Sequence, residues 1–257
     1  MITNKTKRLL DKIHGNVFIS DKFHLVTNKT KLNYISTKKI PQSWITINFK
    51  TYQRLPRISF KEIKLQKTRQ SDLLSKRRSV RQFLGSAISK KELYYLLFQS
   101  SGLTYLGKSP DQSRRPYPSA GARYPLEIYP LILNCDNIEK GLYHYNVKED
   151  VLELLLNKDL KEWISNITNG ERWLEKAAVI FIITGVLDRT RVKYGDRGYR
   201  YVLLEAGHLG QNLCLLATEL GLGTCAIGGY IDAEVNKLLD VSLQKEVTLY
   251  LIAAGKV

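Results

Sequence analysis

Lys193 and Tyr194 place an amine next to a phenol, in a segment rich in Tyr and Arg. Side chains of these two types can transfer protons or bind a ligand. The residues that follow, 199–220, repeat apolar and small side chains every three or four positions, which predicts a helix with one buried face. Gly221 and Gly223 are expected to end this helix. The sequence therefore predicts a polar binding segment held in place by a core helix.

A second candidate site is the basic run that contains Arg77, Arg78, Ser79 and Arg81. In an extended segment Arg77, Ser79 and Arg81 project to one side and Arg78 to the other. Two guanidinium groups and a hydroxyl can then converge on one anion, such as a phosphate. The alternative is a surface cluster of basic residues in a region that is already basic.

Two further segments consist of small residues. Pro118, Ser119, Ala120 and Gly121 begin a proline-bracketed stretch directly before an apolar run. Small side chains let backbone N–H groups approach a flat ligand closely. Residues 223–229 form a glycine-rich turn that does not match the GxGxxG phosphate loop. Taken alone, each segment is equally typical of an ordinary turn.

The remaining pattern predicts the elements that must position these residues. Ser89 and Glu92 form a capping box, so a helix is expected to begin there and to end near Gly102, with an inward stripe of Leu93, Leu96, Leu97 and Ser100. Other predicted helices span 161–167 and 232–239, and predicted strands span 127–134, 143–146, 151–156, 178–184, 224–227 and 248–255. Helices and strands interleave, so the fold class is α/β or α+β.

Charge is distributed unevenly along the 257 residues. Residues 1–108 hold 23 Lys and Arg against 5 Asp and Glu, whereas residues 109–257 hold 17 against 19. We expect a basic N-terminal extension, residues 1–60, with short strands or turns at 16–20 and 43–49, followed by one domain, residues 61–257. Such an extension could meet nucleic acid, an anionic membrane or an acidic partner, or be a solvated lysine-rich face.

Several classes of protein are disfavoured. The three cysteines are too scattered for a disulfide framework or a zinc site, and the four histidines lack partners at ligand spacing, so no metal site is expected. Neither an export signal nor a membrane-spanning run is visible, which favours the cytoplasm. Within the long helix, Glu205 is expected to be the buried partner of an arginine and His208 an interior or interface residue.

Taken together and in order, these motifs resemble the nitroreductase superfamily of flavin enzymes. The resemblance is closer to the SagB-type dehydrogenases, which oxidise azoline rings in thiazole/oxazole-modified peptides of the microcin type. It covers about residues 76–257 and is carried by RRSVRQF, PSAGARYPLEIY, GLYHYNVKEDVLELL, KYGDRGYRYVLLEAGHLGQN and GLGTCAIGG. The upstream segment INFKTYQRLPRISF is similar to the family's linker between extension and core.

The resemblance implies an α+β fold, with a central mixed or antiparallel sheet flanked by helices, and a homodimer that binds two FMN molecules at its interface. Expected roles follow position by position. The phosphate, ribityl chain or pyrimidine edge would be held by Arg77, Ser79 and Arg81, with Arg78 nearby. The isoalloxazine would be lined by Pro118, Ser119, Ala120 and Gly121 of the other subunit and approached by Ile227, Gly228 and Gly229. Gln211 and Asn212 would reach the flavin or the dimer interface.

The resemblance also implies a role for the Lys–Tyr pair. Lys193 would be the general base that takes a proton from the azoline ring while the flavin accepts a hydride, and Tyr194 would orient the ring or relay the proton. A free lysine has a pKa of roughly 10.4, so this role needs burial or neighbouring cations such as Arg191 or Arg197. The alternative is a solvated lysine beside a core tyrosine.

The function implied is the FMN-dependent oxidation of thiazoline or oxazoline rings in a ribosomally made peptide, with O2 reoxidising the flavin. Expected partners are a second copy of the chain, the azoline-bearing precursor peptide and the cyclodehydratase of the same pathway, with neither nucleic acid nor membrane. One alternative is an NAD(P)H-dependent nitroreductase or quinone reductase. A second is a basic protein that binds nucleic acid or a partner.

Overall fold

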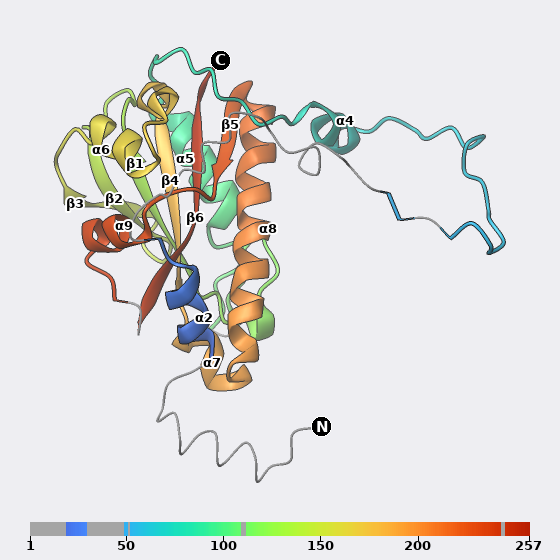
Figure 1. Ribbon diagram of the computed structural model, residues 1–257. Helices are drawn as coiled ribbons and strands as arrows, with labels where there is room; N and C mark the ends of the chain where they lie inside the picture. The colour runs from blue at the N-terminus through green and yellow to red at the C-terminus, as the bar shows by residue number, and fades with distance from the viewer. Residues whose placement is uncertain (1–18, 30–48, 51, 109–111, 243–244) are drawn as a thin grey trace, which may run out of the picture.

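The computed structural model describes residues 19–29, 49–50, 52–108, 112–242 and 245–257. Its described strands form one six-stranded antiparallel sheet in the order β3-β2-β1-β4-β6-β5 (Figure 1). The strands are β1 (Leu126–Ile132), β2 (Gly141–Asn146), β3 (Val151–Leu156), β4 (Val179–Val186), β5 (Leu222–Ile227) and β6 (Glu246–Lys256). The expected α+β class with an antiparallel sheet is confirmed.

Helices cover both faces of the sheet (Figure 1). They are α2 (Ile19–Thr27), α4 (Arg69–Lys76), α5 (Lys90–Ser101), α6 (Lys161–Ile167), α7 (Asp188–Tyr194), α8 (Arg197–Glu219) and α9 (Asp232–Leu239), with short 3-10 turns η2 (Ala120–Ala122) and η3 (Arg172–Lys176). α5 and α8 share one apolar core with one face of the sheet, while α6, η3 and α9 pack on the other face.

Strand β4 shows why the sheet is buried on both faces. Its side chains alternate, so that Phe181 and Ile183 enter the core under α5 and α8, and Ile180 and Ile182 enter the opposite core. All four side chains are fully buried. A strand with a run of five apolar residues, 179–183, therefore lies at the centre of the fold, as its composition predicts.

The predicted capped helix is confirmed as α5. Ser89 Oγ accepts the N–H of Glu92 at 3.1 Å, the Glu92 carboxylate accepts the N–H of Ser89 at 2.6 Å, and Gly102 ends the helix. The long helix α8 also agrees, and Gly221, with φ +71°, follows its last turn. Gly223 lies inside β5 instead of ending the helix, and Val80 and Val257 pack where a side chain at this position would be.

Three helices were not predicted. α2 lies in the expected extension and packs on the start of α8, where His24 Nδ1 and the Tyr199 hydroxyl are 2.8 Å apart. α4 has a capping box, Thr68 with Ser71, but no buried residue. α7 is short and polar, so its sequence carries no apolar period. The segment 43–49, for which a strand or turn was expected, lies almost wholly outside the described residues.

Within the described part of the chain, no helix has both the length and the apolar character needed to cross a membrane.

Candidate functional site

The basic run lies along the edge of strand β5. Ser79 pairs with Thr224 in a parallel bridge, and the N–H of Val80 donates to the Thr224 carbonyl at 2.8 Å. This pairing holds Arg77 and Ser79 at the wall of a cavity of about 240 Å³, whose other walls come from α8, β5 and β6. A guanidinium and a hydroxyl facing one cavity are suited to an anionic ligand.

Glycine residues of α8 shape the same cavity, which Gly207 and Gly210 line together with Gln211. A Cβ on Gly210 would lie 3.0 Å from Ile252 and 3.1 Å from the ring of Tyr250, so glycine lets α8 pack closely on β6. Asn212, the residue named as a candidate from the sequence, is half-buried and does not line this cavity.

Arg81 departs from the expected arrangement. It lines a neighbouring cavity of about 310 Å³ together with Ile227, Gly228 and Gly229, and Ala226 contributes to both cavities. The regular pairing with β5 is confined to Ser79, so the strict alternation assumed from the sequence does not continue as far as Arg81.

Arg78 is exposed and turns back along its own chain. Its guanidinium donates to the carbonyls of Ser75 and Arg77 at 2.6 and 2.8 Å. The expectation that Arg78 projects away from Arg77 and Ser79 agrees with this placement.

The small-residue segment forms a turn with unusual backbone geometry. Gly121, Ala122 and Tyr124 have backbone φ values of +63°, +52° and +44°, a region that residues other than glycine rarely adopt. The Ser119 hydroxyl accepts the N–H of Tyr124 at 2.8 Å and so holds the turn closed. Strained backbone of this kind is concentrated at functional sites.

The turn contacts the Lys–Tyr pair directly. A Cβ on Gly121 would lie 2.7 Å from the Tyr194 hydroxyl and 3.1 Å from Lys193 Nζ. The tertiary structure therefore brings together two motifs that are about seventy residues apart in the sequence. The Tyr194 ring also packs edge-on against Tyr201 of α8, with ring centres 5.1 Å apart. The two chemically suggestive segments form one group.

Glu205 of α8 lies close to Ser119 and Ala120 of this turn. The buried Glu205 carboxylate lies close to the Ser119 hydroxyl, the Ala120 N–H and Arg115, and each of these groups favours its charged form. In the described part of the chain its Oε1 has no hydrogen-bond partner. Burial raises the pKa of Glu205 to about 7, although these donors and Arg115 oppose the shift. Glu205 is buried as expected, and Arg115 is the arginine that acts on it, although the two form no ion pair among the described residues.

The surroundings of Lys193 differ from those expected. Its side chain is exposed in a single copy of the chain. Arg191 is buried and directed toward α2, where it forms an ion pair with Asp21 and donates to the Ser20 hydroxyl at 2.8 Å. Its guanidinium is therefore engaged with α2. Lys193 becomes buried only if another molecule covers this end of the protein.

Helix α8 separates the two groups of candidate residues. Successive helical residues turn by about 100°, so Glu205, which lies close to the turn, points about 140° to 180° away from the cavity residues Gly207, Gly210 and Cys214. An exposed strip of α8, formed by Leu203, Leu204, Gly207, His208 and Gln211, borders the cavity and shares Gly207 and Gln211 with its wall. His208 is consequently a surface residue of the single chain, so of its two expected placements the interior one is excluded and the interface one stays a prediction.

The two cysteines at the cavities are ill-suited to nucleophilic chemistry. Cys214 and Cys225 are buried, and this burial raises the pKa of each thiol, with Arg77 and Arg81 respectively opposing the shift. The neutral thiol is a poor nucleophile.

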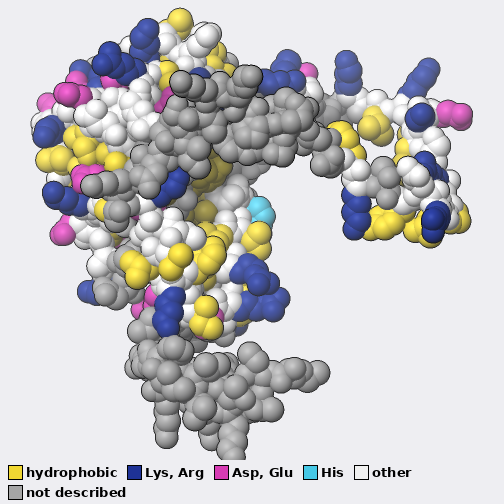
Figure 2. All heavy atoms as spheres, in the orientation of Figure 1, with side chains coloured by type: hydrophobic (Ala, Val, Ile, Leu, Met, Phe, Trp, Pro, Cys, Tyr) yellow, Lys and Arg dark blue, Asp and Glu magenta, His cyan; other side chains and the backbone are white. Residues whose placement is uncertain are grey.

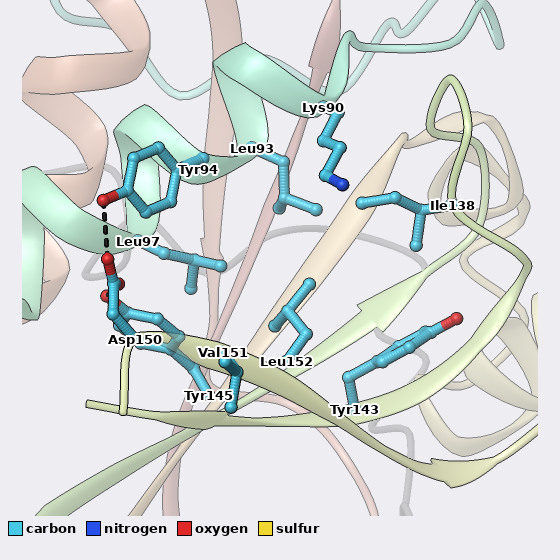
Figure 3. A pocket seen from close by; sticks show the side chains of 10 residues that line it. All are labelled: Lys90, Leu93, Tyr94, Leu97, Ile138, Tyr143, Tyr145, Asp150, Val151 and Leu152. Carbon is cyan, nitrogen blue, oxygen red and sulfur yellow. Dashed lines mark hydrogen bonds between the residues drawn. The ribbon is translucent and has the colours of Figure 1, made fainter. Parts of the chain in front are cut away.

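A further cavity, of about 360 Å³, lies away from both groups, between α5 and the β2–β3 hairpin (Figure 3). Its walls are mainly apolar and include Leu93, Leu97 and Leu152. At one end Asp150 accepts hydrogen bonds from the hydroxyls of Tyr94 and Tyr145 at 2.7 and 2.6 Å. Nothing in the sequence pattern marks this cavity, because most of its lining residues have the pattern of ordinary core positions.

Comparison with known proteins defines the class. The model of the Nitroreductase family matches residues 74–256, and the chain belongs to this family. The nitroreductase MJ1384 of Methanocaldococcus jannaschii is 36% identical over 195 residues, which cover 76% of this chain and 92% of that protein. The resemblance inferred from the motifs is thereby confirmed, and the chain is an oxidoreductase of the nitroreductase type.

A second relative refines the class. The microcin B17-processing protein McbC of Escherichia coli is 31% identical over 153 residues, which cover 58% of this chain and 56% of that protein. The chain thus matches only about half the length of McbC. A chain of the E. coli microcin synthetase McbBCD complex, solved with truncated pro-MccB17 bound, shares the fold with a TM-score of 0.72 at 23% identity, over 93% of this chain and 92% of that one.

Proposed function

We propose that this chain is an FMN-dependent dehydrogenase that oxidises thiazoline or oxazoline rings of a ribosomally synthesised peptide to thiazole or oxazole, with O2 reoxidising the flavin. The observation that carries the proposal is the contact of Lys193 and Tyr194 with the strained turn at Gly121. The relationship to the microcin B17-processing protein McbC supports it. A peptide-modifying dehydrogenase needs a positioned proton acceptor, and this group supplies a candidate.

The proposed chemistry divides between the residues and the cofactor. Conversion of an azoline to an azole removes a proton from one ring carbon and a hydride from the next. FMN, when bound, supplies the acceptor for the hydride. Lys193 Nζ would take the proton, and Tyr194 would orient the ring through its hydroxyl. Arg77 and Ser79 would hold the phosphate or the pyrimidine edge, with Arg81, Gly228 and Gly229 on the other side of Ala226.

The fit of these residues to FMN requires two subunits. The cavity lined by Arg77 and Ser79 and the turn that contacts the Lys–Tyr pair lie on different sides of α8, and the exposed strip borders that cavity. A second copy packed against this strip would bring its own turn and Lys–Tyr pair to the cavity of the first. It would also cover Lys193, whose side chain is exposed in the single chain. We therefore propose a homodimer with two shared sites.

The direct test is mass spectrometry of an azoline-bearing peptide incubated with the purified protein and FMN. The expected result is a loss of two hydrogens for each ring oxidised. Lys193→Ala should abolish this loss, whereas Lys237→Ala, at an exposed position of α9 on the other face of the sheet, should leave it unchanged. Unchanged turnover by the Lys193 variant would exclude it as the base.

Subunit sharing can be tested by complementation. Lys193→Ala and Arg77→Ala should each inactivate the homodimer. A mixed dimer, isolated by two different affinity tags after coexpression, should regain about half of the wild-type activity, because one of its two sites receives both intact residues. A mixed dimer that stays inactive would contradict sharing between subunits.

A nitroreductase activity is the competing candidate, and the relationship to MJ1384 favours it. Such an enzyme takes its electrons from NAD(P)H, whereas the proposed dehydrogenase takes them from the peptide. Rapid anaerobic bleaching of the flavin by NADPH would support the nitroreductase, and bleaching by the azoline peptide alone would support the dehydrogenase.

The McbBCD structure contains a synthetase complex with a bound peptide, and this chain shares the fold of one of its chains. We accordingly propose that this protein acts beside the cyclodehydratase that makes the azoline. Copurification with that enzyme, tested with purified components, would support this association.

A further inference from the structure

The described residues within 49–68, which are 49–50 and 52–68, form an arm that stands away from the folded body (Figure 1). Every described residue in this range is exposed. The arm has two local turns, closed by backbone hydrogen bonds from Leu55 to Tyr52 and from Ile63 to Phe60. Its described hydrogen bonds are all local, so the rest of the described chain offers it no support.

The composition of this arm does not suit a solvated linker. It carries large apolar side chains at regular intervals, with exposed fractions of 58% to 87%: Phe49, Tyr52, Leu55, Ile58, Phe60, Ile63 and Leu65. Figure 2 shows these hydrophobic side chains interleaved with lysine and arginine along the arm. Disordered linkers are poor in aromatic and branched aliphatic residues, whereas exposed apolar groups of this size mark contact surfaces.

The root of the arm indicates which molecule it contacts. The arm leads directly into α4, which packs on α8, and Arg69 forms an ion pair with Glu219 near the end of α8. In Figure 1 the arm extends on the side where α8 is the outermost element of the body. The exposed strip of α8, with Leu203 and Leu204 40% and 56% exposed, is the surface on which the second copy is proposed to pack.

The length of the arm is sufficient to embrace such a copy. Twenty residues of extended chain reach at most about 65 to 70 Å, whereas the 23 residues of α8 span about 35 Å. The arm can therefore cross the whole face of a second molecule that lies against α8.

We propose that residues 49–68 clasp a second copy of this chain, with their apolar side chains buried on the body of that copy. The inference rests on the homodimer of the proposed function and deepens it, since the arm and α8 would form one continuous interface. By symmetry each subunit would give one arm and receive one.

Cross-linking between isotopically distinct chains tests this inference. A photoreactive phenylalanine analogue is placed at Phe60, and the unlabelled variant is mixed and equilibrated with 15N-labelled protein before irradiation. The expected cross-linked peptides pair unlabelled arm with labelled body. Cross-links found only within one chain, or none to the chain at all, would overturn the proposal, including the case in which the arm binds a different protein.

Sedimentation of an arm variant provides the second readout. Ile58→Asp with Phe60→Asp should raise the dimer dissociation constant by roughly a hundredfold. The control is Val151→Asp with Leu155→Asp, two exposed apolar positions on edge strand β3, which should dimerise like the wild type. Equal dissociation constants for the arm variant and the wild type would refute the clasp.

Neither readout uses flavin or peptide, so each is independent of the proposed catalytic activity. A dimer without cross-links from the arm would retain the shared site and overturn the clasp alone. Because the arm residues are exposed in the single chain, circular dichroism of the variants should match the wild type.

Discussion

Replacing Gly121 by alanine perturbs the proposed site with a single methyl group. The added Cβ would lie 2.7 Å from the Tyr194 hydroxyl and 3.1 Å from Lys193 Nζ. Ordinary contacts of a Cβ begin at about 3.4 Å, so the tyrosine must move by several tenths of an ångström. The backbone also carries a penalty, because Gly121 has φ +63° and alanine in this region costs about 1 to 2 kcal/mol.

Gly221→Ala separates these two effects. Gly221 has φ +71°, and a Cβ there would meet nothing within 4 Å. Both variants should therefore lose about 1 to 2 kcal/mol of unfolding free energy. Only Gly121→Ala should also displace the Lys–Tyr pair. A misplacement of 1 Å at a reacting centre can cost about a hundredfold in rate, so a loss of about tenfold in kcat is expected for this smaller shift.

The assay combines denaturant unfolding with turnover of an azoline peptide under saturating FMN. The expected result is equal destabilisation of the two variants, with reduced kcat for Gly121→Ala alone. If both variants turned over peptide at the same rate, the contact between Gly121 and the Lys–Tyr pair would have no catalytic role. If Gly121→Ala lost FMN but kept its rate when saturated, the turn would serve binding alone.

Two further variants test the supports of the site. Burial raises the pKa of Glu205 from 4.5 to about 7. Between these pH values the folded chain keeps a proton on Glu205 that the unfolded chain releases, so the free energy of unfolding should fall by about 3 kcal/mol as pH rises from 4.5 to 7. Glu205→Gln should remove this decline in urea unfolding at a series of pH values, and an identical pH profile would show that the carboxyl does not titrate in this range. Gly223→Ala would crowd Val257 and the side chain of Val80, at 3.1 Å, and should weaken FMN binding measured by flavin fluorescence more than Gly221→Ala does. Equal affinities would mean that the basic run does not hold the cofactor.

Local patterns in the sequence determined most of the secondary structure. Ser89 and Glu92 specify the start of α5 through contacts within one helical turn, and the three-to-four spacing of residues 199–220 specifies α8. The helices α6 and α9 lie where the pattern places them. The central strand β4 is apolar on both faces over residues 179–183 because helices cover both faces of the sheet. These features depend on neighbours in the chain and on burial alone, which a sequence records directly.

The order of the motifs along the sequence also indicated the family. The basic run, the small-residue turn and the Lys–Tyr pair resemble one family, and the match of the Nitroreductase model to residues 74–256 confirms it. The roles proposed for these motifs toward FMN and peptide depend on how the folded chain groups the motifs, which their order alone does not give.

Only the tertiary structure decided how the candidate residues are grouped. It places Lys193 and Tyr194 against Gly121, assigns Arg81 to a different cavity from Arg77, and directs Arg191 toward α2. Helices α2 and α7 escape prediction because ion pairs and hydrogen bonds with distant residues hold them in place. Contacts between residues far apart in the chain leave no periodic trace, so they become visible only when the chain is folded.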